Sequence, residues 1–274
     1  MIRFRAGIFL VALASVLVPG RGVGAGLNAA VEIPAPPVPG ARMPAVPLPG
    51  RLVLPAGGGR APVVILLHGC GGAGRGRFQL EDWTRRLLSW GYGALIVDSL
   101  TPRAVDTVCA PADQPKVTGS DRAGDVIDAA LWLQAQPGVD GGRLGVIGFS
   151  HGGGTVMAVT ARHFQDLHPG LLKAAVNYYG PCRPQLEHGT VPLLAYGGED
   201  DTWGFPASTC TEFGKHLRPD QPFQVVTYPD TVHAFDNPRL LKRRYGEGHP
   251  EQYNSVSAED SFRRTRAFLD QWLR

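Results

Sequence analysis

The stretch LGVIGFSHGGGT, residues 144–155, joins a short apolar run to a glycine-rich turn around Ser150. Residues 144–149 have the composition of a buried strand, and a helix of small residues is expected from Gly152 onward. Residues 148–152 match the G-x-S-x-G pattern, in which the serine sits on a sharp strand-to-helix turn. Glycines must flank the serine, because side chains there would clash within the turn. The stretch predicts Ser150 as a nucleophile; the alternative is a glycine-rich turn holding an idle serine.

The next feature is a base for this serine. A serine hydroxyl needs a histidine, itself oriented by a carboxylate, and the expected chain order is serine, acid, histidine. Six histidines lie beyond the motif, but only His233 follows a strong strand ending and a candidate acidic loop. That loop is residues 197–201 (GGEDD), directly after an expected strand at 192–196. His233 is therefore the predicted general base.

A glycine-rich loop at residues 68–72 (HGCGG) follows the apolar run at 63–67. The tetrahedral intermediate of acyl transfer needs backbone N–H groups aimed at its oxyanion. One should come from His151, the residue after the nucleophile, and the other from this loop, at Cys70. A plain tight turn is the alternative for the loop.

Short apolar runs alternate with amphipathic segments along the chain. This alternation predicts an α/β protein with a mostly parallel central sheet and helices on both faces. The expected strands are residues 63–67, 94–97, 144–149, 174–178, 192–196 and 223–228, and the expected helices are 80–90, 121–136, 152–164 and 257–273, the last capped by Ser257.

The N-terminal region divides into two parts. Residues 1–25 hold Arg3 and Arg5, then an apolar run and a small-residue cleavage site, which predicts a signal peptide and an exported, periplasmic or secreted protein. Residues 26–50 are rich in proline and predict an extended leader rather than packed structure. Residues 51–274 then form the catalytic domain.

Charge argues against two classes of partner. The chain carries 27 basic and 24 acidic residues, and three of the basic ones lie in the first 25 residues. The remainder is neutral, so we expect no nucleic acid partner and no membrane insertion after signal cleavage. No spacing of His, Cys and Asp suggests a metal site, and no cofactor is expected.

The four cysteines (Cys70, Cys109, Cys182 and Cys210) all lie beyond the predicted signal peptide. An even number in an oxidising compartment predicts disulfides, and four cysteines allow three pairings. We expect Cys182 with Cys210 and Cys70 with Cys109, because these pairs join loops at the same end of neighbouring strands. Four unpaired buried thiols are the alternative.

Five segments together resemble the dienelactone hydrolase family of α/β-hydrolases: residues 68–72 (HGCGG), 97–99 (VDS), 148–153 (GFSHGG), 197–201 (GGEDD) and 228–236 (YPDTVHAFD). The resemblance spans about residues 50–274 and implies a single-domain hydrolase of carboxylic esters or lactones. It implies the triad Ser150, Asp200 and His233, with the acid three residues after the first glycine of its loop. Counting from Gly198 instead would give Asp201. The best-known members of the family carry cysteine in place of this serine and are cytoplasmic.

Other functions remain open at this point. A peptidase or amidase of the same fold would use the same triad. Gly69, Gly71 and Gly74 also satisfy the G-x-G-x-x-G pattern of dinucleotide-binding domains, with Asp98 as the ribose contact. A third alternative is a non-catalytic binding protein that kept the fold. Arg103 is either a surface residue or a contact for a substrate carboxylate.

Overall fold

The computed structural model describes residues 26–36, 42–57, 59–182, 187–203 and 207–274. Its central feature is an eight-stranded sheet in the order β1-β2-β4-β3-β5-β6-β7-β8. The strands are β1 (Asn28–Ile33), β2 (Leu48–Val53), β3 (Ala61–Leu67), β4 (Gly93–Val97), β5 (Val139–Phe149), β6 (Ala174–Tyr178), β7 (Leu193–Gly198) and β8 (Phe223–Tyr228). All six strands from β3 to β8 run parallel, whereas β1 and β2 are antiparallel to their neighbours. The predicted α/β class with a mostly parallel sheet is confirmed.

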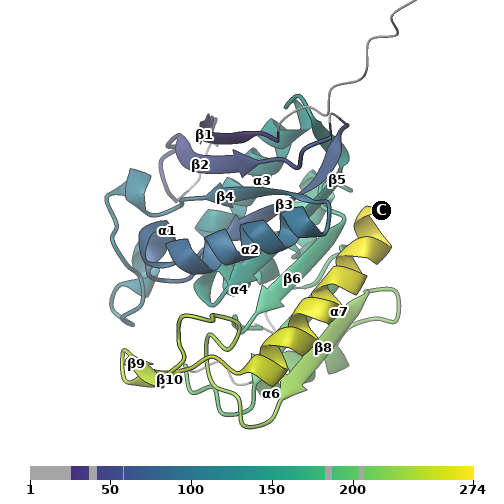
Figure 1. Ribbon diagram of the computed structural model, residues 1–274. Coiled ribbons are helices and arrows are strands. Elements are labelled where there is room, and N and C mark those ends of the chain that lie inside the picture. The colour runs from purple at the N-terminus through teal and green to yellow at the C-terminus, as the bar shows by residue number, and fades with distance from the viewer. Residues whose placement is uncertain (1–25, 37–41, 58, 183–186, 204–206) are drawn as a thin grey trace, which may run out of the picture.

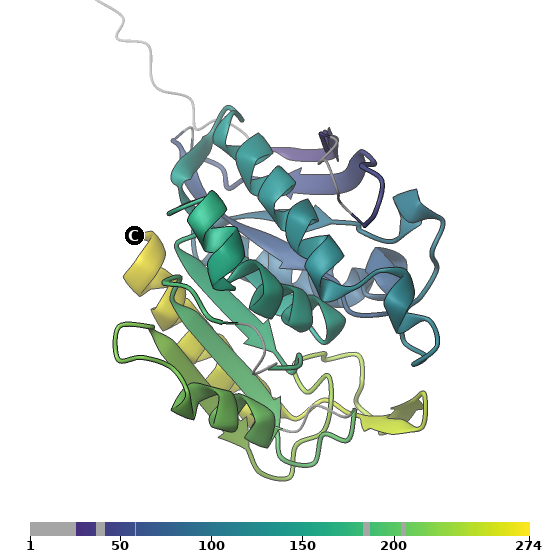
Figure 2. The same cartoon turned by 180° about the vertical axis from the view of Figure 1, so that it is seen from behind.

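Helices cover both faces of this sheet. Helices α2 and α7 lie on the face seen in Figure 1, and α3, α4 and α6 lie on the face seen in Figure 2. The helices are α1 (Gly72–Arg75), α2 (Arg77–Ser89), α3 (Gly119–Gln134), α4 (His151–Val159), α5 (Arg162–Leu167), α6 (Ala207–Lys215) and α7 (Ser255–Leu273), with 3-10 turns at Thr101–Arg103 and Gln114–Lys116. A small hairpin of β9 (Arg244–Gly246) and β10 (His249–Glu251) precedes α7.

The hydrophobic core follows this layering. Every residue of β3, β6 and β7 is buried, as expected for parallel strands covered on both faces. One cluster packs α3, α4 and α6 against the sheet, and a second packs α2 and α7 against the other face around Trp83. Within the described ranges, no helix has the length and apolar character of a membrane span.

The predicted leader is wrong for the part of it that the structure describes. Residues 28–33 form β1, and β2 begins at Leu48, so the sheet starts well before residue 51. Ile33 and Leu48 are fully buried in the core. Pro49 lies inside β2, where its carbonyl still accepts a hydrogen bond from the Asp98 N–H at 2.9 Å. Proline is tolerated near a sheet edge because it lacks only the donor of the ladder. The predicted signal peptide, residues 1–25, lies outside the described residues.

Two helix predictions also need correction. The helix expected at 152–164 is two helices, because the chain turns between Val159 and Arg162 before continuing as α5. The last helix is capped by Asn254 rather than Ser257: the Asn254 side chain accepts from the Ser257 N–H at 3.3 Å. Asparagine is as good an N-cap as serine, and the helix simply begins two residues earlier than expected.

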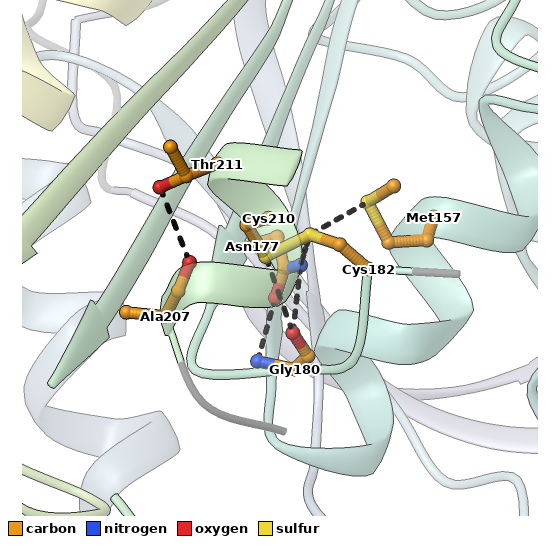
Figure 3. Close-up of a disulfide and its surroundings, with 7 residues drawn as sticks. All are labelled: Met157, Asn177, Gly180, Cys182, Ala207, Cys210 and Thr211. Atoms are coloured by element: carbon orange, nitrogen blue, oxygen red, sulfur yellow. Dashed lines mark hydrogen bonds between the residues drawn. A yellow bond between two sulfur atoms is a disulfide. The ribbon is translucent and has the colours of Figure 1, made fainter. Parts of the chain in front are cut away.

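Both predicted disulfides are present, Cys70–Cys109 and Cys182–Cys210, with sequence separations of 39 and 28 residues. Cys182–Cys210 ties the loop after β6 to α6 (Figure 3). Beside it, Asn177 accepts from the Gly180 N–H at 2.8 Å and donates to the Gly180 carbonyl at 3.2 Å, which closes the turn after β6. This disulfide therefore anchors a tight turn rather than a surface loop.

We expect the variant Cys182→Ala/Cys210→Ala to lose roughly 3–4 kcal/mol of unfolding free energy, because the link restricts a long loop in the unfolded chain. Urea denaturation under non-reducing conditions measures this loss. The matched variant Cys70→Ala/Cys109→Ala removes a link that closes a loop of similar length and should lose a similar amount. A change below about 1 kcal/mol in both variants would contradict the expectation.

Candidate active site

Ser150 lies at the turn between β5 and α4, in a backbone conformation that non-glycine residues rarely adopt (φ 55°, ψ −115°). The turn is held from one side by the Ser150 N–H, which donates to the Tyr178 carbonyl at 2.9 Å. A Cβ on Gly148 would lie 2.1 Å from the Gly152 carbonyl oxygen, and a Cβ on Gly152 would lie 2.5 Å from that of Leu67. The two glycines of the motif are therefore required by close backbone approach, as the sequence predicted.

His233 lies in the loop after β8 and is 3% exposed. Its Nδ1 is 2.7 Å from Oδ2 of Asp201. Since a carboxylate only accepts, Nδ1 carries the hydrogen and Nε2 of the neutral ring is left as an acceptor. The ring also packs against Tyr179 and Trp203, with centroids 4.6 and 5.2 Å away. These contacts hold the imidazole in the tautomer that a general base needs.

The prediction that Asp200 orients His233 is wrong by one residue, because the acid bonded to His233 is Asp201. Asp200 is exposed, whereas Asp201 is 4% exposed and bonds to the imidazole. The reason lies in the backbone. The N–H of Asp200 donates to the Thr231 carbonyl at 3.0 Å, so the chain up to Asp200 runs beside the loop that carries His233. Asp201 is the next residue beyond this contact, and its carboxylate reaches the imidazole. The second oxygen of Asp201 accepts from the Trp203 N–H at 3.0 Å. This approach depends on Gly198, where a Cβ would lie 2.1 Å from the Thr231 carbonyl oxygen.

The glycine-rich loop after β3 packs directly on the turn at Ser150. A Cβ on Gly69 would lie 3.6 Å from the Cβ of Ser150. Cys70 and His151, the two predicted oxyanion donors, line one cavity together with Ser150. The structure thus brings Ser150, Cys70 and His151 together at the carboxyl ends of the parallel strands.

This cavity has a volume of about 570 Å³. Its wall comes from the loop before α3, the start of α4, the turn after β6 and Trp203, and the described lining residues are Cys70, Val108, Cys109, Gln114, Pro115, Thr118, Gly119, Ser120, Ser150, His151, Gly154, Ala158, Pro181 and Trp203. Apart from the imidazole of His151, none of these side chains is acidic or basic. The volume suits a small-molecule substrate.

Arg103 is not available to a substrate. Its guanidinium pairs with Asp125 at 2.7 Å, and both side chains are nearly buried. The dinucleotide interpretation also finds no support, because Asp98 accepts from the N–H groups of Leu100 and Thr101 and so closes its own turn. In the described part of the chain, no group of His, Cys, Asp or Glu side chains could hold a metal ion.

Asp236 supports the site although no sequence motif assigns it a role. Asp236 is buried and accepts from Tyr179 at 2.6 Å, from Trp83 at 2.7 Å and from Gln79 at 2.9 Å, so it fixes the tyrosine that packs on His233. Burial raises the pKa of Asp236 and raises that of the Tyr179 hydroxyl well above its usual value. The signal for Asp236 was its place in the HAFD segment, three residues after the histidine.

We expect Asp201→Asn to lower kcat by about 10³–10⁴-fold, because an amide cannot hold His233 as the carboxylate does. Asp200→Asn changes an exposed neighbour of the same chemistry and should cost less than about tenfold. Steady-state kinetics with melting curves on both variants measure this. A crippled Asp200→Asn beside a fully active Asp201→Asn would reverse the assignment.

A second expectation concerns the turn itself. Gly148→Ala should lose about 3 kcal/mol of unfolding free energy and most activity, because its Cβ would overlap the Gly152 carbonyl. Gly74→Ala is the control, since nothing lies within 4 Å of the Cβ it would add. Thermal unfolding and ester hydrolysis of both proteins test the difference, and equal behaviour would refute it.

Comparison with known proteins agrees with this geometry. The model of the dienelactone hydrolase family matches residues 48–273. A Bradyrhizobium protein named "Probable 2-oxo-3-(5-oxofuran-2-ylidene)propanoate lactonase" is 26% identical over 236 residues, covering 80% of this chain and 87% of that protein.

Two solved structures share the fold. One is a dienelactone hydrolase from Anabaena variabilis (20% identity, TM-score 0.63, 91% of this chain and 100% of that one). The other is a dienelactone hydrolase-like promiscuous phosphotriesterase from metagenomic libraries (22% identity, TM-score 0.70, 92% of this chain and 100% of that one). These findings support an ester or lactone hydrolase with the α/β-hydrolase fold, and the chain belongs to the dienelactone hydrolase family.

Proposed function

We propose that this protein is an exported serine hydrolase that cleaves small carboxylic esters or lactones through an acyl-serine intermediate. The observation that carries the proposal is the buried His233–Asp201 pair, together with Ser150 on a strained turn at the wall of a substrate-sized cavity. Family membership and the lactonase relative favour esters and lactones over amides. The two disulfides fit an oxidising compartment outside the cytoplasm.

In this mechanism the Ser150 hydroxyl attacks the substrate carbonyl while Nε2 of His233 takes its proton. Asp201 stabilises the imidazolium that forms. The N–H groups of Cys70 and His151 hydrogen-bond the oxyanion of the tetrahedral intermediate. Its collapse expels the alkoxide, which takes the proton back from His233 and, in a lactone, stays attached to the acyl group. Water activated by His233 then attacks the acyl-serine, and Ser150 is regenerated.

The cavity also favours an uncharged acyl group. The described lining carries no lysine, arginine or acid, and the nearby Arg103 is committed to Asp125. A substrate carboxylate would have to give up its hydration without a partner there, which is costly. Neutral esters and simple lactones are therefore the proposed substrates.

The test of the nucleophile is Ser150→Ala, which should lower kcat by on the order of 10⁴ or more with little change in Tm. A fluorophosphonate probe should label the wild-type protein once, at Ser150, and should not label the variant. Substrate class is tested on matched panels of aryl esters, lactones and anilides, each with and without a carboxylate. A Ser150→Ala variant whose kcat stays within tenfold of the wild-type kcat would overturn the proposed function.

A further inference from the structure

A buried arginine lies behind the site, outside the proposed catalytic residues. Arg122, in the first turn of α3, has no exposed surface. One terminal nitrogen donates to Nδ1 of His151 at 2.8 Å. The other donates to the carbonyl oxygen of His68 at 2.9 Å. A single guanidinium thus bridges two segments that are far apart in sequence.

Both acceptors belong to segments that carry a proposed oxyanion donor. His68 opens the loop that leads to Cys70, and His151 directly follows the nucleophile. The loop has a second attachment through the imidazole of His68, whose Nδ1 donates to the Gly69 carbonyl at 2.7 Å and whose Nε2 accepts from the Ser99 N–H at 3.2 Å. Burial and the nearby Arg122 charge hold the pKa of His68 well below its usual value, so this ring is neutral.

The guanidinium is suited to this bridge. Burial lowers the pKa of Arg122 to about 10, so it stays charged at neutral pH, and Asp125 and Asp98 offset part of the cost. Its planar fork fixes the directions of two donors at once, which a lysine ammonium does not. An arginine never accepts a hydrogen bond, so Nδ1 of His151 must be the acceptor. The His151 ring is held neutral with its hydrogen on Nε2.

We propose that Arg122 is a positioning residue that sets the spacing between the two halves of the oxyanion hole. This inference rests on the proposed function, since it assigns Arg122 a part in the same reaction. The role is indirect, because the guanidinium contacts the loop carbonyl and the His151 ring rather than the substrate. A displacement of about 1 Å between oxyanion donors costs on the order of 10²-fold in rate.

The test compares Arg122→Lys with Arg103→Lys, two charge-conserving changes at buried arginines. Arg103 donates from both terminal nitrogens to Asp125 and also to the Ser99 carbonyl, so a lysine there loses the fork but still faces a carboxylate. A lysine at 122 faces only a carbonyl and an imidazole, and we expect it to reach one of them at most. We expect Arg122→Lys to lower kcat by about tenfold to a hundredfold with KM within about threefold, and Arg103→Lys to stay within about threefold in both. Melting curves show whether the two variants are equally folded.

A second readout separates positioning from a merely structural effect. Sulfur accepts hydrogen bonds weakly, so an intact oxyanion hole should prefer an ester to the matching thionoester. Arg122→Lys should reduce this ratio of kcat/KM, and Arg103→Lys should leave it at the wild-type value. A loss of general stability would lower both rates and leave the ratio unchanged.

Substitution of His151 keeps the proposal testable if Arg122→Lys does not fold. His151→Asn leaves an amide that can accept from Arg122, and His151→Leu leaves no acceptor. We expect the asparagine variant to keep about tenfold more kcat than the leucine variant, with a higher ester-to-thionoester ratio. Equal kinetics for these two variants, or a folded Arg122→Lys with wild-type kcat and ratio, would overturn the positioning role. Wild-type protein that neither hydrolyses esters nor reacts with the fluorophosphonate would instead refute the proposed function.

Discussion

The sharp turn between β5 and α4 holds the backbone of Ser150 in a rare conformation, and the rest of the site is built around this turn. The chain reverses within so short a distance that Gly148 and Gly152 have no room for a Cβ. Gly153 is under the same constraint from the other side, where a Cβ would lie 2.2 Å from the side-chain oxygen of Asn177. A turn packed this closely has few alternative conformations, so it presents the serine in one orientation.

The loops that meet this turn are fixed by covalent and polar links. The loop at 100–117 has a small core of its own, with Leu100, Val108 and Val117 fully or almost fully buried, and Cys70–Cys109 joins it to the glycine-rich loop. Such a small core contributes little stabilisation, because stabilisation grows with the apolar area buried. The disulfide, the Arg122 bridge and the His233–Asp201 pair supply fixed geometry where the apolar contacts are few. The same loops form the wall of the cavity, so their rigidity bears directly on substrate binding.

The two faces of the sheet serve the site differently. On the side of α2, Trp83 and Gln79 reach Asp236, which holds Tyr179 against His233. On the side of α3 and α4, Arg122 donates to His151, which follows Ser150, and to the His68 carbonyl at the start of the glycine-rich loop. The proposed base and the proposed oxyanion donors are therefore supported by opposite layers of the protein. Each layer fixes its own part of the site through hydrogen bonds from buried polar groups: Trp83, Gln79 and Tyr179 to Asp236 on one side, and the two terminal nitrogens of Arg122 on the other.

The sequence alone determined the elements whose signals are local. Apolar runs located the parallel strands, the G-x-S-x-G turn located Ser150, and the chain order located His233. The cysteine pairing also followed from the sequence, because parallel strands deliver their following loops to one edge of the sheet. The sequence signal for Arg122 is weaker: the residue shares the inward helical register of Val126 and Leu133, where a charge must find buried partners.

Only the tertiary structure decided the features that depend on how separate segments approach one another. Whether Asp200 or Asp201 faces His233 depends on the turn after β7, which the hydrogen bond from the Asp200 N–H to the Thr231 carbonyl fixes. Neighbouring side chains in this turn point in different directions, and only that of Asp201 reaches the imidazole. The proline-rich residues near Leu48 join the sheet because β4 offers a free edge to pair with, which no local propensity reveals. The bridge from Arg122 to His68 and His151 exists only once three segments have met. Local pattern encodes an element, whereas the choice of a partner across space is made by packing.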